Sequence, residues 1–470
     1  MLARLRKVAL WIHRWLGVLF CLLFAMWFLS GMVLMYWDYP EVSARDRLDH
    51  SPPLDPARVR LSPEQAYAGL KQDVPPSSAR LFMFDARPVY QFDDAIVFAD
   101  DGSVQDGFPA DLTLRLAAAW AGELPALAGR QVVTQPDQWT VSGEFRPLRP
   151  FDKYTWPDGN QVYVSQRTGE VAQSTTRSSR IGAYFGAIPH WLYFTPLREN
   201  GRLWNKTVLW ASGAGTVTSL FGLIVGLWIV LPAGRIPYRG QKRWHALLGL
   251  LFGLIASTWV FSGFLSMEPF AFSQGPRQLG SRIAAALNSG DFSLTAFAEK
   301  PPQSVLSPAI KELDFTFVAG EPFYLAQGDR TQLTPIHGRA LDSARLLEIS
   351  KQAAAPSKLI ESHLVTEYEA YYLDRHHQRP LPALFMRFDD PAGSMFYLDP
   401  ATAQIVAGYD SESRWNRWLY HGLHSLDLPW LYRHRPAWDL VALGLLGGGA
   451  WLCVTSVIIA AQLLGRKLRR

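Results

Sequence analysis

The 470-residue chain has very little cysteine, and it lacks the common catalytic signatures. Its only two cysteines, Cys21 and Cys453, lie within long apolar runs. They supply no disulfide framework, no cysteine-based metal site and no c-type haem attachment site. There is also no P-loop, no G-x-G-x-x-G opening a helix after a strand, no G-x-S-x-G and no H-E-x-x-H. Nothing in the sequence therefore indicates a nucleotide or flavin site.

Charge is absent from four long segments of the chain. They contain no Asp, Glu, Lys or Arg and comprise residues 15–37, 207–234, 246–267 and 440–465. Each reaches the roughly 20 residues that a helix needs to cross a hydrocarbon core of about 30 Å. Hydrophobic residues make up 49% of the chain and charged residues 19%, and the apolar residues are clustered rather than spread. This pattern predicts a four-helix membrane protein with soluble insertions, surrounded by membrane lipid.

Acidic residues are missing from three basic clusters next to these segments. The clusters are the N-terminus (Arg4, Arg6, Lys7, Arg14), a short central loop (Arg235, Arg239, Lys242, Arg243) and the C-terminus (Arg466, Lys467, Arg469, Arg470). Cytoplasmic loops carry such an excess of Lys and Arg, so we expect both termini in the cytoplasm and two large segments outside. Because the net charge of +5 comes from these clusters, it gives no support to a nucleic-acid partner.

The chain contains one unit twice. Aligning His13 with His245, an offset of 232, matches two apolar helices, and an offset of 234 matches later residues without a gap. The matches include Leu16/Leu248, Gly17/Gly249, Trp27/Trp259, Ser30/Ser262, Gly31/Gly263, Gly159/Gly393, Tyr163/Tyr397, Arg180/Arg414, His190/His424 and Trp204/Trp438. Since both copies enter the membrane from the same side, the halves should be parallel repeats related by an axis along the membrane normal.

The repeat unit reads as a helix, an outer domain and a second helix. The predicted segments are membrane helices at residues 8–37, 207–234, 244–267 and 440–465, outer domains at 38–206 and 268–439, and a cytoplasmic loop at 235–243. Residues 61–72 and 341–354 have helical patterns, and Ser62 with Gln65 resembles a capping box. Alternating stretches at 79–86, 95–100 and 161–174, and a hairpin turning near 391–393, predict strands. Each outer segment is therefore expected to be an α+β domain.

Histidines that the repeat pairs are the main candidates for a functional site. His13 and His245 lie near the inner ends of the first and third helices, and His190 and His424 lie in the outer links before the second and fourth. Two neutral imidazoles that face each other across a pseudo-axis match the axial ligands of a b-type haem. The pattern predicts two haems, one near each face. An interfacial role like that of Arg14 remains the alternative for the inner pair.

Other residues around the outer pair leave choices open. His421 precedes His424 by almost one helical turn and is an alternative ligand, although Ala187 stands at its place in the first half. Arg180 and Arg414 precede the outer histidines by the same interval in both halves, and either bind haem propionates or form surface ion pairs. His376 and His377 mark either an iron or substrate site or a polar hairpin tip.

Several runs of the sequence resemble a known family. WIHRWLGVLFCLLFAMWFLSG, LSPEQA, VYVSQRTGEV with the following IPHWLYF, and FYLDPATAQIV with the following SRWNRWLYHGLH look like the PepSY-associated transmembrane proteins, which include PiuB-like proteins and FoxB-type siderophore reductases. The resemblance implies a bacterial inner-membrane protein with two periplasmic PepSY-like domains. In the reductase branch it implies haem b bound by the histidines that match here, His13, His245, His190 and His424. One departure, Thr402 to Gln404 where the first half has Thr168 to Glu170, changes only a turn.

The sequence thus predicts a di-haem oxidoreductase that passes electrons from an unknown donor to a ferric siderophore or another iron complex outside. Reduction releases iron because hard oxygen ligands hold Fe(III) better than Fe(II). Two alternatives remain open at this point: a non-redox PepSY module that binds a protease or peptide, and a transporter subunit whose histidines line a path for protons or metal.

Overall fold

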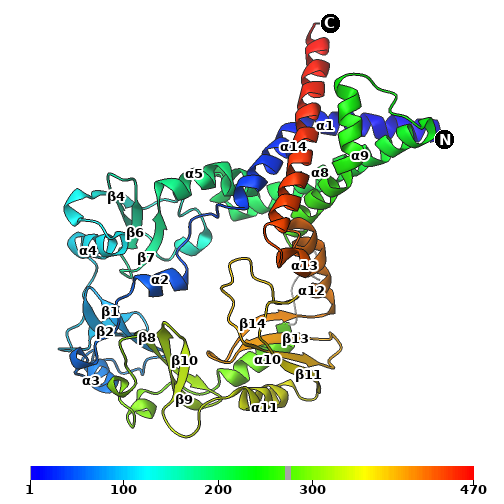
Figure 1. Ribbon diagram of the computed structural model, residues 1–470. Coiled ribbons are helices and arrows are strands. Elements are labelled where there is room, and N and C mark those ends of the chain that lie inside the picture. Colours follow the sequence, from blue (N-terminus) through cyan, green and yellow to red (C-terminus); the bar gives the residue numbers. More distant parts are fainter. Residues whose placement is uncertain (1, 270–276, 470) are drawn as a thin grey trace.

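The computed structural model describes residues 2–269 and 277–469, and it consists of a bundle of four long helices and a larger region of three β-sheets (Figure 1). The four long helices are α1 (Leu2–Leu34), α8 (Gly201–Ala233), α9 (Gln241–Leu265) and α14 (Ala437–Leu468). Each is long and apolar enough to cross a membrane. The predicted number of membrane helices is confirmed, and the chain is a multi-pass membrane protein.

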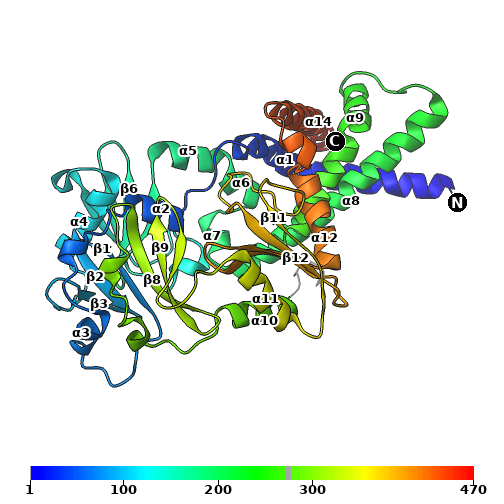
Figure 2. The same cartoon turned by 60° about the horizontal axis from the view of Figure 1, so that its bottom comes forward.

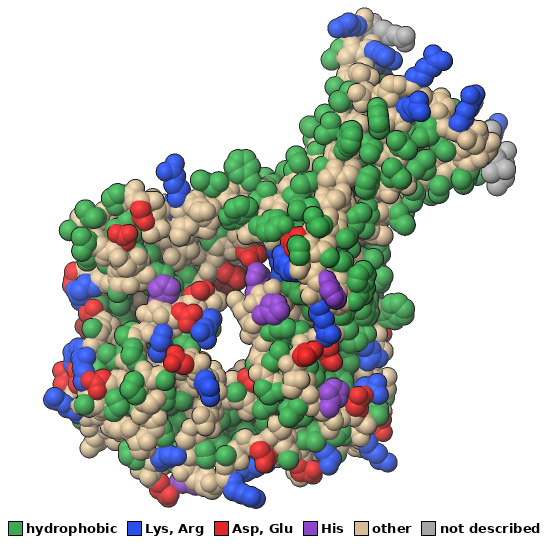
Figure 3. Space-filling model, viewed as in Figure 1, with side chains coloured by type: hydrophobic (Ala, Val, Ile, Leu, Met, Phe, Trp, Pro, Cys, Tyr) green, Lys and Arg blue, Asp and Glu red, His purple; other side chains and the backbone are tan. Residues whose placement is uncertain are grey.

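The outer surface of the bundle is apolar, as a lipid-facing surface requires. Trp210 on α8 is 75% exposed and Leu19 on α1 is 70% exposed. Lys and Arg side chains gather at the ends of the helices that point away from the sheets (Figure 3). Inside the bundle, glycines receive aromatic rings of neighbouring helices: Gly449 of α14 lies against Phe28, and Gly448 lies against Phe252. The small residues of α14 therefore allow close helix packing.

Fourteen strands are described outside the bundle, and every pair of neighbours is antiparallel. They are β1 (Ala79–Phe84), β2 (Arg87–Phe92), β3 (Ala95–Phe98), β4 (Gly129–Val133), β5 (Phe151–Thr155), β6 (Gln161–Ser165), β7 (Val171–Thr175), β8 (Ile310–Val318), β9 (Glu321–Gly328), β10 (Gln332–Pro335), β11 (Leu359–Val365), β12 (Ala383–Phe388), β13 (Met395–Asp399) and β14 (Gln404–Tyr409). The sheet orders are β10-β9-β8-β1-β2-β3, β4-β5-β6-β7 and β11-β12-β13-β14.

The six-stranded sheet contains strands of both outer segments. β1 pairs with β8, and Leu81 lies opposite Leu313 in this pairing. The strands lie side by side in both ribbon views (Figures 1 and 2). Leu81, Tyr90, Leu313 and Tyr324 are fully buried in one core that also spans both segments. The sequence predicts one α+β domain in each segment; strand patterns alone do not show that the two domains share a sheet, because they do not specify which edges pair.

Short helices connect and cover the sheets. They are α2 (Ala44–His50), α3 (Pro63–Ala68), α4 (Ala110–Ala121), α5 (Arg177–Phe185), α6 (Ala187–Trp191), α7 (Thr195–Arg198), α10 (Arg277–Leu287), α11 (Ser343–Ala354), α12 (Ser411–Asn416) and α13 (Pro429–Tyr432), with a π-helical stretch, η7 (Arg417–Gly422), after α12. Single turns of 3₁₀-helix are η1 (Pro56–Arg58), η2 (Pro125–Leu127), η3 (Gly143–Phe145), η5 (Leu294–Phe297) and η6 (Pro302–Ser304). The expected capping box is present at Ser62 and Gln65.

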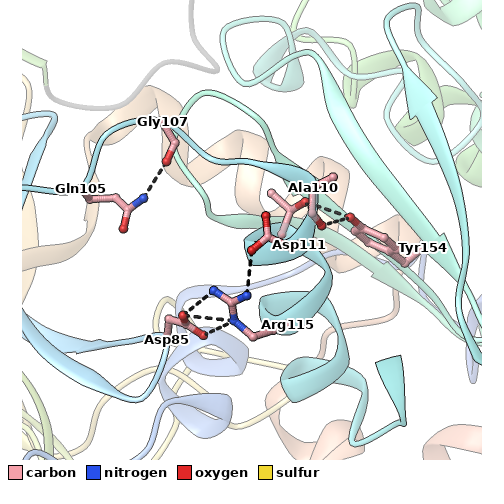
Figure 4. A network of polar contacts seen from close by, with 8 residues as sticks. Asp85, Gln105, Gly107, Ala110, Asp111, Arg115 and Tyr154 are labelled. Carbon is pink, nitrogen blue, oxygen red and sulfur yellow. Dashed lines mark hydrogen bonds and ion pairs between the residues drawn. The ribbon is translucent and has the colours of Figure 1, made fainter. Parts of the chain in front are cut away.

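Helix α4 links two of the sheets. Arg115 on α4 contacts Asp85 in the turn between β1 and β2 at 2.9 Å, and Asp111 one turn earlier at 3.0 Å (Figure 4). On its other side, the hydroxyl of Tyr154 on β5 donates to the carbonyl oxygen of Ala110. These contacts join the six-stranded sheet to the sheet β4–β7.

The loop between β11 and β12 returns to the outer end of α1. Arg375 donates to the carbonyl oxygens of Leu34 and Met35, the last turn of that helix. Cations are favourable at this position because the final carbonyls of a helix carry partial negative charge. His376 lies 3.6 Å from Asp38 in the chain that leaves α1. The sheet region thereby encloses an opening that is visible in the space-filling view (Figure 3).

Candidate functional site

The structure brings the paired histidines together at two places in the bundle region. His13 on α1 and His245 on α9 have ring centroids 6.1 Å apart. His190 on α6 and His424, just after η7, have ring centroids 6.0 Å apart. Helix α1 carries His13 of the inner pair and also Ser30, which contacts His190 of the outer pair. Because an α-helix rises about 1.5 Å per residue, the two pairs lie about 25 Å apart along α1. This separation is close to the thickness of a hydrocarbon core, about 30 Å.

Hydrogen bonds at the inner pair fix which ring nitrogen carries the proton. Nδ1 of His13 lies 3.1 Å from the carbonyl oxygen of Thr218, which can only accept, so this nitrogen donates. Nδ1 of His245 lies 3.3 Å from the hydroxyls of Thr455 and Ser456. Both hydroxyls donate to the carbonyl oxygen of Leu452, so they accept from His245. Nε2 of each histidine is left with a lone pair.

The outer pair has the same arrangement. Nδ1 of His190 lies 3.2 Å from the carbonyl oxygen of Trp27 and 3.2 Å from the Ser30 hydroxyl. Nδ1 of His424 lies 3.0 Å from the hydroxyl of Ser262, which itself donates to the Trp259 carbonyl oxygen. Burial, and next the neighbouring His424, lower the pKa of His190 to about 3, and burial lowers the pKa of His424. Both imidazoles are therefore neutral at pH 7, which is the metal-binding form.

The spacing of the two pairs fits a bis-histidine iron site. In a bis-histidine iron site, each metal–nitrogen bond is about 2 Å long, and each ligating nitrogen lies about 1 Å from the centre of its ring. The centres of the two imidazole rings are therefore about 6 Å apart. The observed separations are 6.1 Å and 6.0 Å. A ligating histidine also usually donates its other N–H to a carbonyl or hydroxyl, as all four do here. In the part of the chain that the structure describes, no hydrogen bond uses Nε2 of these four rings.

Glycines make room for the imidazoles. A Cβ atom on Gly222 of α8 would lie 2.5 Å from Cε1 of His13. At the outer pair, Gly31 of α1 and Gly263 of α9 would place a Cβ 3.4 Å from His190 and 3.8 Å from His424. Between the pairs the bundle is filled by apolar side chains, including the buried rings of Phe28 and Trp259, 5.8 Å apart.

The remaining predicted residues differ in their surroundings. The ring of His421 contacts Tyr420, with centroids 4.5 Å apart, whereas the ring contact of His190 is with His424. The guanidinium groups of Arg180 and Arg414 donate to the carbonyl oxygens of Gly159 and Gly393, which belong to the corresponding hairpins of the two segments. Contact of these arginines with propionates stays a prediction, and so does a ligand role for His421.

His376 and His377 occupy a turn. The side chain of Asp374 accepts from the backbone N–H groups of His376, Gln378 and Arg379, as in a polar loop tip. Within residues 2–269 and 277–469, no group of three or more His, Cys, Asp or Glu side chains could hold a metal ion. Cys21 and Cys453 are buried free thiols.

Residues that orient the histidines were missed by sequence reasoning. Ser30 and Ser262 are identical in the repeat, and this identity was the available signal for their equivalent hydrogen bonds to His190 and His424. Gly222 and Thr218 carried no signal, because Gly222 corresponds to Ser456 in the second half. Their role depends on how α8 packs against α1.

No curated protein matches the chain. The PepSY-associated TM region family matches residues 10–313, more than half of the chain. The matched range includes most of α1, all of α8 and α9, and three of the four paired histidines, His13, His190 and His245. The protein belongs to the PepSY-associated TM region family.

Proposed function

We propose that the protein is a di-haem b oxidoreductase of the bacterial inner membrane, of the FoxB type, that passes electrons across the membrane to a periplasmic ferric complex such as a ferric siderophore. The observation that carries this proposal is the presence of two histidine pairs with ring centroids about 6 Å apart. His13 and His245 would hold one haem and His190 and His424 the other. A bound haem supplies an iron that cycles between Fe(III) and Fe(II) and so carries one electron at a time.

The protein's own groups prepare the sites. Each Nδ1–H is held by an oxygen of a neighbouring helix, which fixes the tautomer and leaves the Nε2 lone pair free to bind iron. Apolar packing excludes water from the rings, which raises the cost of charging them and keeps them as neutral ligands. The outer pair is placed next to the sheet region, where a ferric complex would arrive.

The proposed orientation follows from the basic ends of the helices. Lys and Arg lie at the helix ends remote from the sheets (Figure 3), which supports cytoplasmic termini and a periplasmic sheet region. The halves would be parallel repeats, and equivalent contacts support this. The indole N–H of Trp204 donates to the Trp191 carbonyl oxygen, and that of Trp438 donates to the Ser425 carbonyl oxygen, each pair being 234 residues apart.

The first test is the visible spectrum of the purified full-length protein, oxidised and reduced, with its haem-to-protein ratio. We expect a low-spin b-type spectrum and about two haems per chain. His13→Ala and His245→Ala should each remove the same inner haem, whereas His363→Ala, in an exposed strand position of β11, should retain both. A folded protein that purifies without haem would refute the proposal.

The second test follows iron. The wild-type protein, reduced with dithionite, should transfer electrons to a ferric hydroxamate siderophore, with Fe(II) trapped by a ferrous-specific chelator. Loss of haem through His190→Ala should abolish this transfer. A non-redox binding module would keep its partner after loss of His13 and His245, and a transporter would need these histidines without any absorbing cofactor.

A further inference from the structure

Two residues at the outer pair break the internal repeat together. At an offset of 234, Arg417 and His421 stand where the first half has Ala183 and Ala187. They are four residues apart in the helical stretch formed by η7, so they lie on one face of it. His424, the proposed ligand, follows His421 by three residues. The second half therefore has a polar pair directly before its proposed ligand, where the first half has two alanines.

Arg417 is a buried cation with an unused donor. Its side chain is 4% exposed, and its Nη2 donates to the backbone oxygen of Asp427 at 2.7 Å. Nη1 is buried and has no hydrogen-bond partner among the described residues. A buried charged donor without a partner is costly, which points to an acceptor that binds there. Gly422 lies beside this group, because a Cβ on Gly422 would lie 3.6 Å from Nη1 and 3.2 Å from the ring of Trp418, over which the guanidinium lies at 4.5 Å.

No ion pair engages the guanidinium of Arg417. Asp427 interacts with Arg417 electrostatically, and its pKa is raised to about 6 by burial, so it is mostly ionised at pH 7; yet no ion pair joins the two side chains among the described residues. His421 reaches the surface, yet desolvation by the surrounding protein, and next the positive charges of Arg417 and Arg379, lower its pKa. The rings of His421 and His424 both contact the ring of Tyr420, with centroids 4.5 Å and 5.6 Å from it. The side chain of Arg417 thus has no ion-pair partner among the described residues, and its Nη1 is left without an acceptor.

We propose that Arg417 and His421 form a carboxylate-binding site beside the His190–His424 pair. The guanidinium Nη1 supplies a charged donor and the imidazole a neutral one, a set that suits a carboxylate. The carboxylate comes from either of two sources: a propionate of the outer haem, or a carboxylate of an anionic ferric complex. The first source rests on the proposed function. By contrast, Arg180 and Arg414 already donate to backbone carbonyls.

The experiment compares Arg417→Gln with Arg433→Gln in the full-length protein. Arg433 is the control because it belongs to neither proposed site and its guanidinium donates to the Tyr368 carbonyl oxygen. Three quantities are measured: the haem-to-protein ratio, the reduction potentials of the haems, and the affinity for citrate as a free carboxylate probe. Arg417→Lys, which keeps the charge, and His421→Asn are measured alongside in case Arg417→Gln does not fold.

Each source gives a distinct result. If the carboxylate is a propionate, Arg417→Gln lowers the outer haem content or shifts one of two potentials, Arg417→Lys partly restores it, and citrate has no effect. If it belongs to a soluble anion, the haems are unchanged and citrate affinity falls by about tenfold. Arg417 and His421 variants that match the Arg433 control in all three quantities would overturn the proposal. A wild-type protein without haem would refute the proposed function, and citrate binding would then decide the site alone.

Discussion

Gly222→Ala should remove the proposed inner haem without changing one of its proposed ligands. A Cβ at Gly222 would lie 2.5 Å from Cε1, 2.9 Å from Nδ1 and 3.3 Å from Nε2 of His13. Ordinary carbon–carbon contacts are about 3.5 Å, so the ring of His13 has to move by about 1 Å. The Nδ1 bond to the Thr218 carbonyl oxygen, 3.1 Å long, opposes that movement. Because a metal–nitrogen bond is about 2 Å long, a displacement of 1 Å breaks axial ligation.

The assay is the spectrum and haem-to-protein ratio of the variant. We expect the ratio to fall from about two to about one, or one haem to change from low to high spin. The control is Gly226→Ala, one turn later on α8, where a Cβ would meet only Leu250 at 3.6 Å, an ordinary contact. Overpacking alone costs about 1–3 kcal/mol of stability, so the melting temperature of each variant is measured in parallel. A folded Gly222→Ala protein with both haems in unchanged spin states would refute the reasoning.

Three further predictions concern other parts of the molecule. Ser262→Ala removes the acceptor of the His424 Nδ1–H and should weaken retention of the proposed outer haem by about 10–100-fold in a haem-transfer assay. The control is Ser257→Ala, which should not weaken retention because the Ser257 hydroxyl bonds only to the Gly253 carbonyl oxygen. Equal retention by the two variants would contradict the orienting role of Ser262. Asp314 on β8 has its pKa raised to about 7, first by burial and next by Glu312, against lowering by Gln327 and Arg80. The folded state therefore holds its proton more tightly than the unfolded state, so its stabilisation is complete below about pH 4 and is lost as the pH rises to about 7. Asp314→Asn should flatten this part of the melting-temperature profile, and an unchanged slope would be the contrary result. Arg115→Ala should cost less than about 1 kcal/mol in denaturant unfolding because its ion pairs with Asp85 and Asp111 are exposed, and a larger loss would mean that α4 holds the sheets together through these charges.

The sequence predicted the elements whose signal is local. The four uncharged runs became α1, α8, α9 and α14, and the hairpin expected near 391–393 lies between β12 and β13. The capping box at Ser62 is present because its two hydrogen bonds depend only on residues three apart. All four helices begin a few residues before the predicted segments, in charged residues, since a helix can continue past the membrane surface, whereas α1 and α9 end at Leu34 and Leu265, before the predicted ends at 37 and 267.

Features that depend on pairing between distant segments were not predictable in the same way. The junction of β1 and β8 needs two strand edges far apart in sequence to meet, and neither strand pattern specifies its partner. Gly222 was likewise invisible, because its importance arises from the approach of α8 to His13. The paired histidines were identified because the internal repeat supplied long-range information that composition and periodicity do not contain.

The junction of β1 and β8 also bears on how the two halves are related. In an antiparallel pairing of equivalent strands, one residue lies opposite its own counterpart, and this position marks the two-fold axis. Leu81 lies opposite Leu313, an offset of 232, the same interval that separates His13 from His245. One axis through the sheet and the bundle would therefore place each histidine opposite its counterpart at equal depth, which supports the proposed ligation between halves rather than within one.

The two halves differ where Arg417 and His421 stand in place of Ala183 and Ala187, so under such an axis they are not interchangeable at this point. A porphyrin carries its propionates along one edge, so a haem held between the two halves would meet each half with a different edge. Arg417 and His421 supply such a difference beside the His190–His424 pair.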